Sequence, residues 1–305
     1  MALKDDFPFG MVLPHRSTMP LDVAEVRAVA QRDPALQLGR VGVDRHVPVA
    51  VEPRVGRSDH DARVDRDNAG FVGDQRVDVE LAQLRQLIGD AARDQDITAV
   101  GIVTPGIVDD ETGLIQYAAN LRLRDCDLRT QLAASTGLPI FSGHDGRAAT
   151  LAEHAVGSAQ KFHDFALLPI GTGISVGLMI DGRLAAADGF AGEIGHANVG
   201  HQIQCDCGRS GCFEAVSSAS ALTRRYAAAT GRDLSAEAIV DAATTGDKAA
   251  ADVWQQALDG IGFACDWLIT LLAPQAIVFA GGLSNAGAKL TTAIDQYLTK
   301  SLTFQ

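Results

Sequence analysis

The sequence is poor in positive charge, in long apolar runs and in cysteine, and each shortage excludes a class of protein. Its 305 residues hold 26 Lys and Arg against 38 Asp and Glu, a formal net charge of −12. A chain this acidic is not expected to bind nucleic acid or an anionic membrane surface as its main partner. The most apolar stretch, residues 268–283, is broken by Pro274 and Gln275, so no segment reaches the roughly 18 residues of a membrane helix.

The N-terminal residues, MALKDDFPFG, lack the basic start and the apolar core of a signal peptide. We therefore expect a cytoplasmic protein, in which thiols stay reduced. The chain is long enough for two domains that share a deep cleft.

Cysteine is scarce, but three of the five cysteines fall within eight residues: Cys205, Cys207 and Cys212. An odd local count in a reducing compartment argues against disulfides, and a bridge between Cys205 and Cys207 would close a strained ring. Zinc prefers four thiolate or imidazole ligands in a tetrahedron, and this spacing supplies three. An upstream histidine would be the fourth, and spacing alone does not choose between His196 and His201. The alternative is a loop with three reduced thiols.

From about residue 80 the chain alternates between strand and helix patterns, which indicates an α/β fold. The expected strands lie within residues 97–106, 138–145, 165–184 and 275–284. The expected helices lie within residues 21–31, 79–95, 128–137, 146–157, 217–231 and 248–272.

Polar residues and glycines stand at strand ends, where α/β proteins bind ligands. Asp145 follows the strand that ends at His144, and its carboxylate could take a hydroxyl proton during phosphoryl transfer, or cap the next helix. The turn Gly171-Thr172-Gly173 exposes backbone N–H groups that suit phosphate oxygens, although a plain hairpin explains it equally well.

Gly281 and Gly282 follow another apolar strand and would let a flat ring or a phosphate approach the backbone. Taken alone, this pair of glycines is a weak signal.

Five motifs occur together in one order, and together they resemble the ROK family of bacterial sugar kinases and sugar-responsive repressors. The resemblance covers roughly residues 80 to 305 and implies a two-domain, actin-like ATPase (ribonuclease H-like) fold with a cleft between the domains. The most specific block is GEIGH followed by CxCGxxGCxE. The motifs are VTPGIVDDETG, LLPIGTGISVGLMIDG, FAGEIGHANV, CDCGRSGCFE and IVFAGGLS.

The resemblance implies ATP-dependent phosphorylation of a hexose or N-acetylhexosamine, with Asp145 as the general base. The substrate-binding residues that it implies are Asn120, His144, Glu193, His196 and Glu214. At position 144 the family usually has Asn, so His144 is a departure that would alter a contact to one sugar hydroxyl.

The resemblance also implies a structural Zn²⁺ and Mg²⁺ bound with ATP. It favours His196 as the fourth zinc ligand beside Cys205, Cys207 and Cys212. It also implies that the protein is a homodimer. The nucleotide-binding positions that it implies are Asp44, Gly171, Thr172, Gly173, Gly281 and Gly282.

The N-terminal part departs from the family. Family kinases open with a DxGGT phosphate loop, but RHVPV follows Asp44 here, and Pro48 lacks a backbone donor. Residues 45–79 are anomalous because they consist almost entirely of Val, Arg, Asp, Gly and Ala. Two interpretations stay open: a segment read out of frame from GC-rich DNA, or a genuinely diverged segment.

We expect three parts: an N-terminal extension of unknown role (residues 1–37), a first α/β domain (38–142) and a second α/β domain with the zinc loop (143–305). The second domain is expected to be truncated at its C-terminal end, because family members continue further. Three functions therefore stay open: a sugar kinase, a sugar-binding regulator without catalysis, and a damaged pseudo-kinase. No DNA-binding domain is recognised in the sequence.

Overall fold

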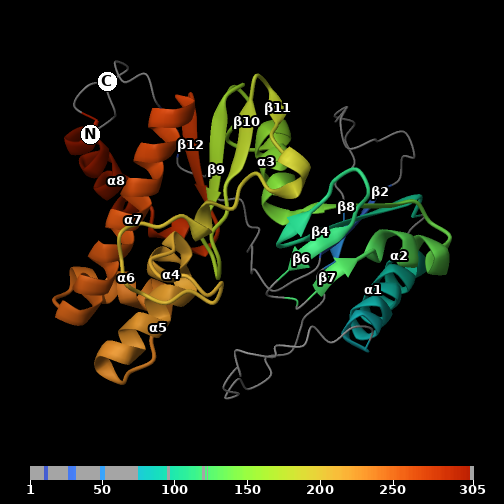
Figure 1. Cartoon of the computed structure of the whole chain (residues 1–305), viewed down its shortest axis with the longest axis horizontal. Coiled ribbons are helices and arrows are strands. Elements are labelled where there is room, and N and C mark those ends of the chain that lie inside the picture. The colour runs from blue at the N-terminus through green and yellow to red at the C-terminus, as the bar shows by residue number, and fades with distance from the viewer. Residues whose placement is uncertain are drawn as a thin grey trace. The chain divides into compact units, whose positions relative to one another are not determined.

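The structure is a computed structural model that describes residues 10–12, 27–31, 49–51, 75–94, 97–118, 121 and 123–302. Asp44 and Asn120 lie outside these residues, as does most of the anomalous segment 45–79. The described residues divide into two compact units, one within Ala24–Ala148 and Ala186–Phe190, the other within Ala149–Ala185 and Ala191–Gln305 together with β1 (Gly10–Val12). We call them the smaller and the larger unit (Figure 1).

The smaller unit contains a four-stranded sheet in the order β3-β2-β4-β8 and a three-stranded antiparallel sheet β5-β6-β7. In the first sheet β8 pairs with β4 in parallel, and β2 pairs with β4 antiparallel. The strands of this unit are β2 (Arg27–Gln31), β3 (Val49–Val51), β4 (Ala99–Thr104), β5 (Ile107–Val108), β6 (Ile115–Ala118), β7 (Leu123–Cys126) and β8 (Ile140–His144).

The helix expected over residues 21–31 is wrong at its C-terminal half, because Arg27–Gln31 is strand β2. All five residues of β2 are in register with β4, from Arg27 opposite Val103 to Gln31 opposite Ala99. Pairing with β4 satisfies backbone groups along its edge, and this tertiary requirement overrides a local helical preference.

Three helices begin in the smaller unit: α1 (Gln75–Asp94), α2 (Leu128–Thr136) and α3 (Asp145–Val156). Helix α2 begins where the Asp127 carboxylate accepts a hydrogen bond from Thr130 N, and it ends at Gly137 in the left-handed conformation (φ 70°). The core includes Leu81 and Leu84 of α1 together with Ile102 of β4, all buried. Helix α3 continues past Ala148 into the larger unit.

The larger unit is built on a five-stranded sheet in the order β1-β12-β9-β10-β11, in which β1, β12 and β9 are parallel. The expected strand–turn–strand pattern over residues 165–184 is confirmed, because β9 and β10 pair antiparallel on either side of the glycine turn. The strands are β9 (Phe165–Pro169), β10 (Gly177–Ile180), β11 (Arg183–Leu184) and β12 (Ala276–Ala280).

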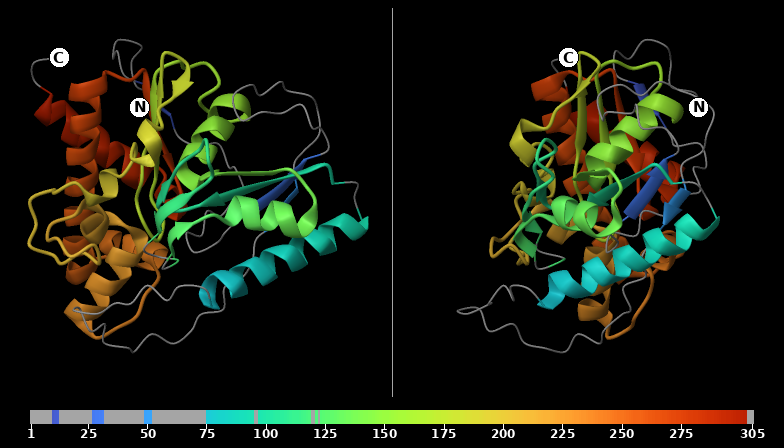
Figure 2. Two further views of the ribbon diagram at one scale, coloured as in Figure 1. Left: turned by 45° about the vertical axis from the view of Figure 1, so that its right-hand side comes forward. Right: turned by 90° about the vertical axis from the view of Figure 1, so that its right-hand side faces the viewer.

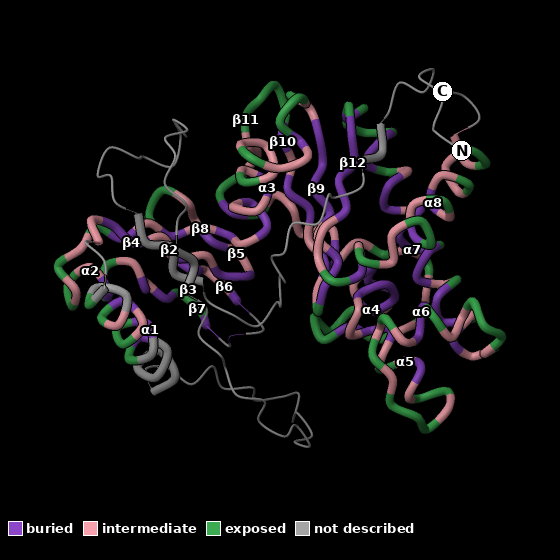
Figure 3. Tube along the Cα trace, turned by 180° about the vertical axis from the view of Figure 1, so that it is seen from behind, coloured by how far each residue is buried: buried purple, intermediate pink, exposed green. Residues whose placement is uncertain are grey.

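The other helices of this unit pack around α7 (Lys248–Leu272), which contacts α4, α5, α6 and α8 (Figures 1 and 2). Twelve residues of α7 are buried, and Figure 3 shows the same burial along β9 and β12. The helices are α4 (Phe213–Ser217), α5 (Ala219–Thr230), α6 (Ala236–Thr244) and α8 (Ala288–Ser301), with short 3₁₀ turns η2 (Ile194–His196) and η3 (Gly282–Ala286). The 3₁₀ turn η1 (Ala187–Gly189) belongs to the smaller unit.

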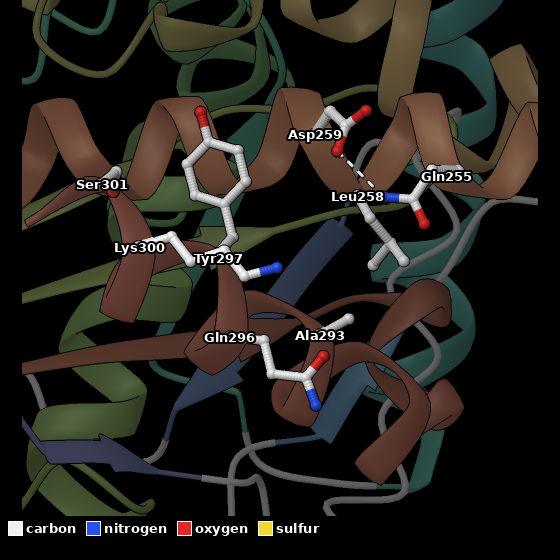
Figure 4. A pocket seen from close by; sticks show the side chains of 8 residues that line it. All are labelled: Gln255, Leu258, Asp259, Ala293, Gln296, Tyr297, Lys300 and Ser301. Carbon is white, nitrogen blue, oxygen red and sulfur yellow. Dashed lines mark hydrogen bonds between the residues drawn. The ribbon is translucent and has the colours of Figure 1, made fainter.

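A pocket of about 480 Å³ lies between α7 and α8 of the larger unit, lined among others by Asp259, Tyr297 and Lys300 (Figure 4). Gln255 Nε2 donates to Asp259 Oδ1 at its rim over 2.9 Å. Of the sequence-predicted site residues that the structure describes, none lines this pocket. Across the described part of the chain, no helix combines the length and the apolarity needed to cross a membrane.

Candidate functional site

The structure brings His196 together with the three clustered cysteines in the larger unit. The imidazole nitrogen of His196 and the Sγ atoms of Cys205, Cys207 and Cys212 all lie within 4.8 Å of one another. Cys205 Sγ is 3.8 Å from His196 Nδ1, and Cys207 Sγ is 3.5 Å from Cys212 Sγ. Ligands about 2.3 Å from a tetrahedral zinc ion stand at such separations, so this donor set fits Zn²⁺.

Local backbone turns create this arrangement, in a segment that we call the cysteine loop (residues 197–212). Gly208 N donates to Cys205 O over 2.9 Å, and Gly208 has φ 87°. A Cβ atom on Gly211 (φ 80°) would stand 2.3 Å from His201 O, so only glycine fits there. The His201 carbonyl oxygen thus lies against the turn, and His196 is the histidine whose ring lies with the three thiols in a group that could hold a metal ion.

The three thiols differ in how readily they ionise. Burial raises the pKa of Cys212 to about 12 and also raises the pKa of Cys205. At Cys207 burial acts in the same direction and is the largest single cause, but hydrogen bonds from Arg209, Cys205 and Cys212 together outweigh it and lower the pKa to about 7. Cysteine binds a metal as the thiolate, and Cys207 is the thiol of the three whose pKa favours that form.

Glu214 connects the cysteine loop with the glycine turn. It lies in the first turn of α4, two residues after Cys212, and its Oε2 accepts a hydrogen bond from Ile174 N over 2.9 Å. On the other side of the same residue, a Cβ atom on Gly195 would lie 2.2 Å from Ile174 O. The GEIGH segment and Glu214 therefore both contact Ile174, which directly follows the glycine turn. Glu193, half-buried, stands at the start of η2.

The glycine turn is fixed by its own backbone and by helix α5. Gly171 N donates to Gly173 O over 3.0 Å, and Gly171 O accepts from Ala219 N over 2.8 Å. The Ser220 hydroxyl donates to Thr172 O, and the Thr172 residue itself is exposed. Hydrogen bonds thus fix the turn at Gly171 and at Thr172, and Thr172 at its tip is exposed to solvent.

The second glycine pair packs against the same segment. Gly281 has φ 77°, and a Cβ atom there would stand 2.6 Å from Ile170 O. Leu283 N donates to Ile170 O over 3.1 Å, and Gly282 begins η3. The structure therefore places both predicted nucleotide-binding glycine segments next to each other in the larger unit.

Asp145 and His144 lie in the smaller unit, where β8 passes into α3 without an intervening loop residue. The Asp145 side chain is 25% exposed, whereas that of His144 is 5% exposed. His144 Nδ1 accepts hydrogen bonds from Gly146 N (3.0 Å) and Arg147 N (3.3 Å), and so caps the helix. Asp145 Oδ1 accepts from Gly146 N over 2.6 Å and is 3.4 Å from His144 Nε2.

Arg147 is a residue of this site that the sequence patterns did not reveal. Its buried guanidinium donates to both carboxylate oxygens of Asp110, over 2.9 and 3.0 Å, and to Val108 O over 2.7 Å. It also donates to Gly189 O over 3.3 Å. The arginine, two residues after Asp145 in the chain, thus connects residues 186–190 with β5 through hydrogen bonds to Gly189 O and Val108 O. An arginine near the start of a helix is ordinarily exposed, so the sequence carried no signal for this contact.

The sheets and helices define a mixed α/β protein. Its cluster of one histidine and three cysteines is connected with the glycine turn through the hydrogen bond between Glu214 and Ile174. The sequence profile of the ROK family matches residues 74–305. The glucokinase of Halalkalibacterium halodurans is 32% identical over 230 residues, covering 70% of this chain and 70% of that protein. The N-acetylglucosamine repressor of Escherichia coli O157:H7 is 30% identical over 232 residues, covering 72% of this chain and 55% of the repressor.

Among solved structures, a ROK family glucokinase from Streptomyces griseus, in complex with glucose and AMPPNP, superposes with a TM-score of 0.66. It is 27% identical, and the match covers 74% of this chain and 78% of that chain. The protein belongs to the ROK family, and its fold is of the actin-like ATPase type. Its relatives include both sugar kinases and repressors, so membership alone does not separate these two activities.

Proposed function

We propose that this protein is a sugar kinase that transfers the ATP γ-phosphate to a hydroxyl of a hexose or N-acetylhexosamine. Asp145 would act as the general base and take the proton of the attacking hydroxyl. Glu193, His196 and Glu214 would accept hydrogen bonds from other hydroxyls, because a sugar site discriminates best through one partner for each hydroxyl. Asn120 and His144 complete the set of sugar ligands predicted from the sequence.

The observation that carries this proposal is the contact between Glu214 and Ile174. It joins a predicted sugar ligand to the residue that follows Gly171-Thr172-Gly173, the predicted phosphate turn, over 2.9 Å. A kinase must hold the sugar hydroxyl and the transferred phosphate in a fixed relative position. The hydrogen bond between Ile174 N and Glu214 would help to fix the two proposed binding segments relative to each other.

The four ligand atoms of His196, Cys205, Cys207 and Cys212 fit a structural Zn²⁺. With all four positions taken by protein, such an ion stabilises the loop and has no open site for chemistry. The loop then holds His196 and Glu214 in place. Mg²⁺ with ATP would bind at the two glycine segments and at Asp44.

A second function is favoured by a specific observation: the DxGGT loop of the family's kinases is replaced after Asp44, while relatives include a repressor. A catalytically impaired sugar-binding protein or a transcriptional regulator of the family would need the sugar site and not the phosphate loop. For either function we propose a cytoplasmic homodimer.

The test measures ADP release with Mg²⁺–ATP against a panel of hexoses and N-acetylhexosamines, beside sugar-dependent melting curves. A kinase should turn over with at least one sugar, and Asp145→Ala should lower kcat by roughly 100-fold or more, the usual contribution of a general base. A melting shift with sugar but no turnover in the wild-type protein would instead establish the regulator. Neither turnover nor a melting shift would contradict both functions.

A further inference from the structure

The residue before Asp145 has both ring nitrogens directed at the start of helix α3. His144 is the last residue of β8 and 4% exposed, and Asp145 is the first residue of α3. The two side chains are therefore neighbours at the point where the strand passes into the helix. Arg147 follows closely, but its guanidinium is engaged by Asp110, Val108 and Gly189.

The backbone fixes which ring nitrogen carries the proton. His144 Nδ1 faces two N–H donors, from Gly146 at 3.0 Å and Arg147 at 3.3 Å. A nitrogen that accepts hydrogen bonds must be unprotonated, so the proton of the neutral ring is on Nε2. Nε2 is 3.4 Å from Asp145 Oδ1, so the N–H of the ring lies beside this carboxylate oxygen.

The same carboxylate oxygen of Asp145 also accepts Gly146 N, over 2.6 Å. Oδ1 thus accepts one backbone N–H and faces the imidazole Nε2 at 3.4 Å, which leaves Oδ2 as the oxygen to take a proton. His144 itself has its two nitrogens directed at protein groups.

We propose that His144 is a positioning residue, which orients the Asp145 carboxylate through Nε2–H and does not bind the sugar directly. This inference rests on the proposed kinase function. It differs from the sequence-based prediction, in which His144 contacts a sugar hydroxyl. Orientation of a general base affects the chemical step, whereas a sugar contact affects substrate binding.

Two substitutions separate the two roles of the ring. In His144→Asn the amide oxygen can stand near the Nδ1 position and cap α3, but no donor reaches Asp145. In His144→Gln the longer side chain brings an amide N–H near the Nε2 position, whereas the cap is lost. We expect His144→Asn to melt like the wild-type protein and to have a kcat lower by on the order of tenfold, with an unchanged KM for sugar. His144→Gln should melt lower and keep kcat within about threefold of the wild-type value.

A rise in the sugar KM of His144→Asn at unchanged kcat would overturn the proposal, because it identifies a direct sugar contact. Equal kcat values in His144→Asn and the wild-type protein would overturn it as well.

The tautomer is read independently of turnover by two-bond ¹⁵N–¹H NMR of histidine-labelled protein, with His144 assigned by its absence in His144→Asn. A proton on Nδ1 would overturn this inference and leave the kinase function standing. A wild-type protein without turnover on any sugar would overturn the kinase function, and with it the catalytic part of this inference.

Discussion

The cysteine loop and helix α7 belong to the same unit but are ordered by different means. Helix α7 buries twelve residues in a core that extends to α4, α5, α6 and β12. The buried cluster at the cysteine loop is small, with Cys205, Cys212 and Ala215 packed against Ile203. Apolar burial therefore orders the helix, whereas glycine turns, together with the proposed metal ligands, order the loop. The residues proposed to bind sugar, His196 and Glu214, flank the loop, so binding should fail before folding does.

The largest effect is expected from Cys212→Ser, which removes one of four proposed zinc ligands. A structural zinc site contributes about 10–16 kcal/mol of apparent binding free energy, so the loop should lose its order. We expect zinc to disappear from the protein by native mass spectrometry, and sugar affinity to fall by roughly 100-fold or more. Unfolding of the α7 core should remain cooperative.

The matched control is Cys126→Ala, because Cys126 is a buried thiol of the smaller unit with a pKa raised by burial to about 11. It should retain full zinc content and sugar affinity. A Cys212→Ser protein that holds zinc and sugar like the wild-type protein would contradict the role given to the loop.

The next effect tests the opposite side of the comparison. Phe213 is fully buried directly after Cys212, in the core that contains α7. Phe213→Ala should lower the free energy of unfolding by about 3–5 kcal/mol through lost burial and a cavity, measured by urea denaturation. Phe213→Leu keeps most of the volume and should cost less than about 1.5 kcal/mol. Equal losses for the two variants would argue that packing is not the cause.

The contrast between loop and helix also explains what sequence reasoning could recover. Helix α7 follows from its apolar spacing, and β4, β8, β9 and β12 follow from short apolar runs bounded by turn signals or polar residues. The short helix α6 (Ala236–Thr244) was not predicted, although Ser235 is its N-cap. β2 was assigned to a helix, because its register with a distant strand leaves no local signal.

The site divides in the same way. The spacing of the cysteines indicated a metal cluster, but the choice of His196 over His201 needed the family resemblance. The contacts of Arg147 are with residues about 40 positions away in the chain. The capping role of His144 depends on the orientation of its ring. Neither leaves a pattern in the sequence.

A moderate effect is expected where the loop meets the sheet. Gly195→Ala would place a Cβ atom 2.2 Å from Ile174 O, in the contact that holds GEIGH against the residue after the glycine turn. We expect a loss of about 1–3 kcal/mol in stability, together with weaker sugar binding, measured by thermal melting with and without sugar.

Gly89→Ala is the control with the opposite sign, because Gly89 lies on the exposed side of α1 with nothing within 4 Å of the added atom. It should stabilise the protein by about 0.5–1 kcal/mol. If Gly195→Ala were as harmless as Gly89→Ala, the close contact would carry no energetic weight.

The smallest effect concerns pH and the start of α7. The hydroxyl of buried Tyr226 donates to Asp247 Oδ2 over 2.7 Å, and this hydrogen bond is the main cause that lowers the pKa of Asp247 below its ordinary value of 3.8. A carboxylate with a lowered folded-state pKa stabilises the fold above its unfolded pKa and loses this contribution as pH falls through the folded pKa. Tyr226→Phe should therefore show a shallower fall of melting temperature below about pH 4. Parallel curves for the two proteins would contradict this account.

The hydrogen bond from Ile174 N to Glu214 Oε2 has a consequence for how two ligands influence each other. A sugar bound through Glu214, as proposed, would compete for its carboxylate and change the free energy of the peptide that ends the turn Gly171-Thr172-Gly173. A nucleotide phosphate bound by that turn, as proposed, would act on the same peptide. Because thermodynamic linkage is reciprocal, each ligand would then change the dissociation constant of the other by the same factor.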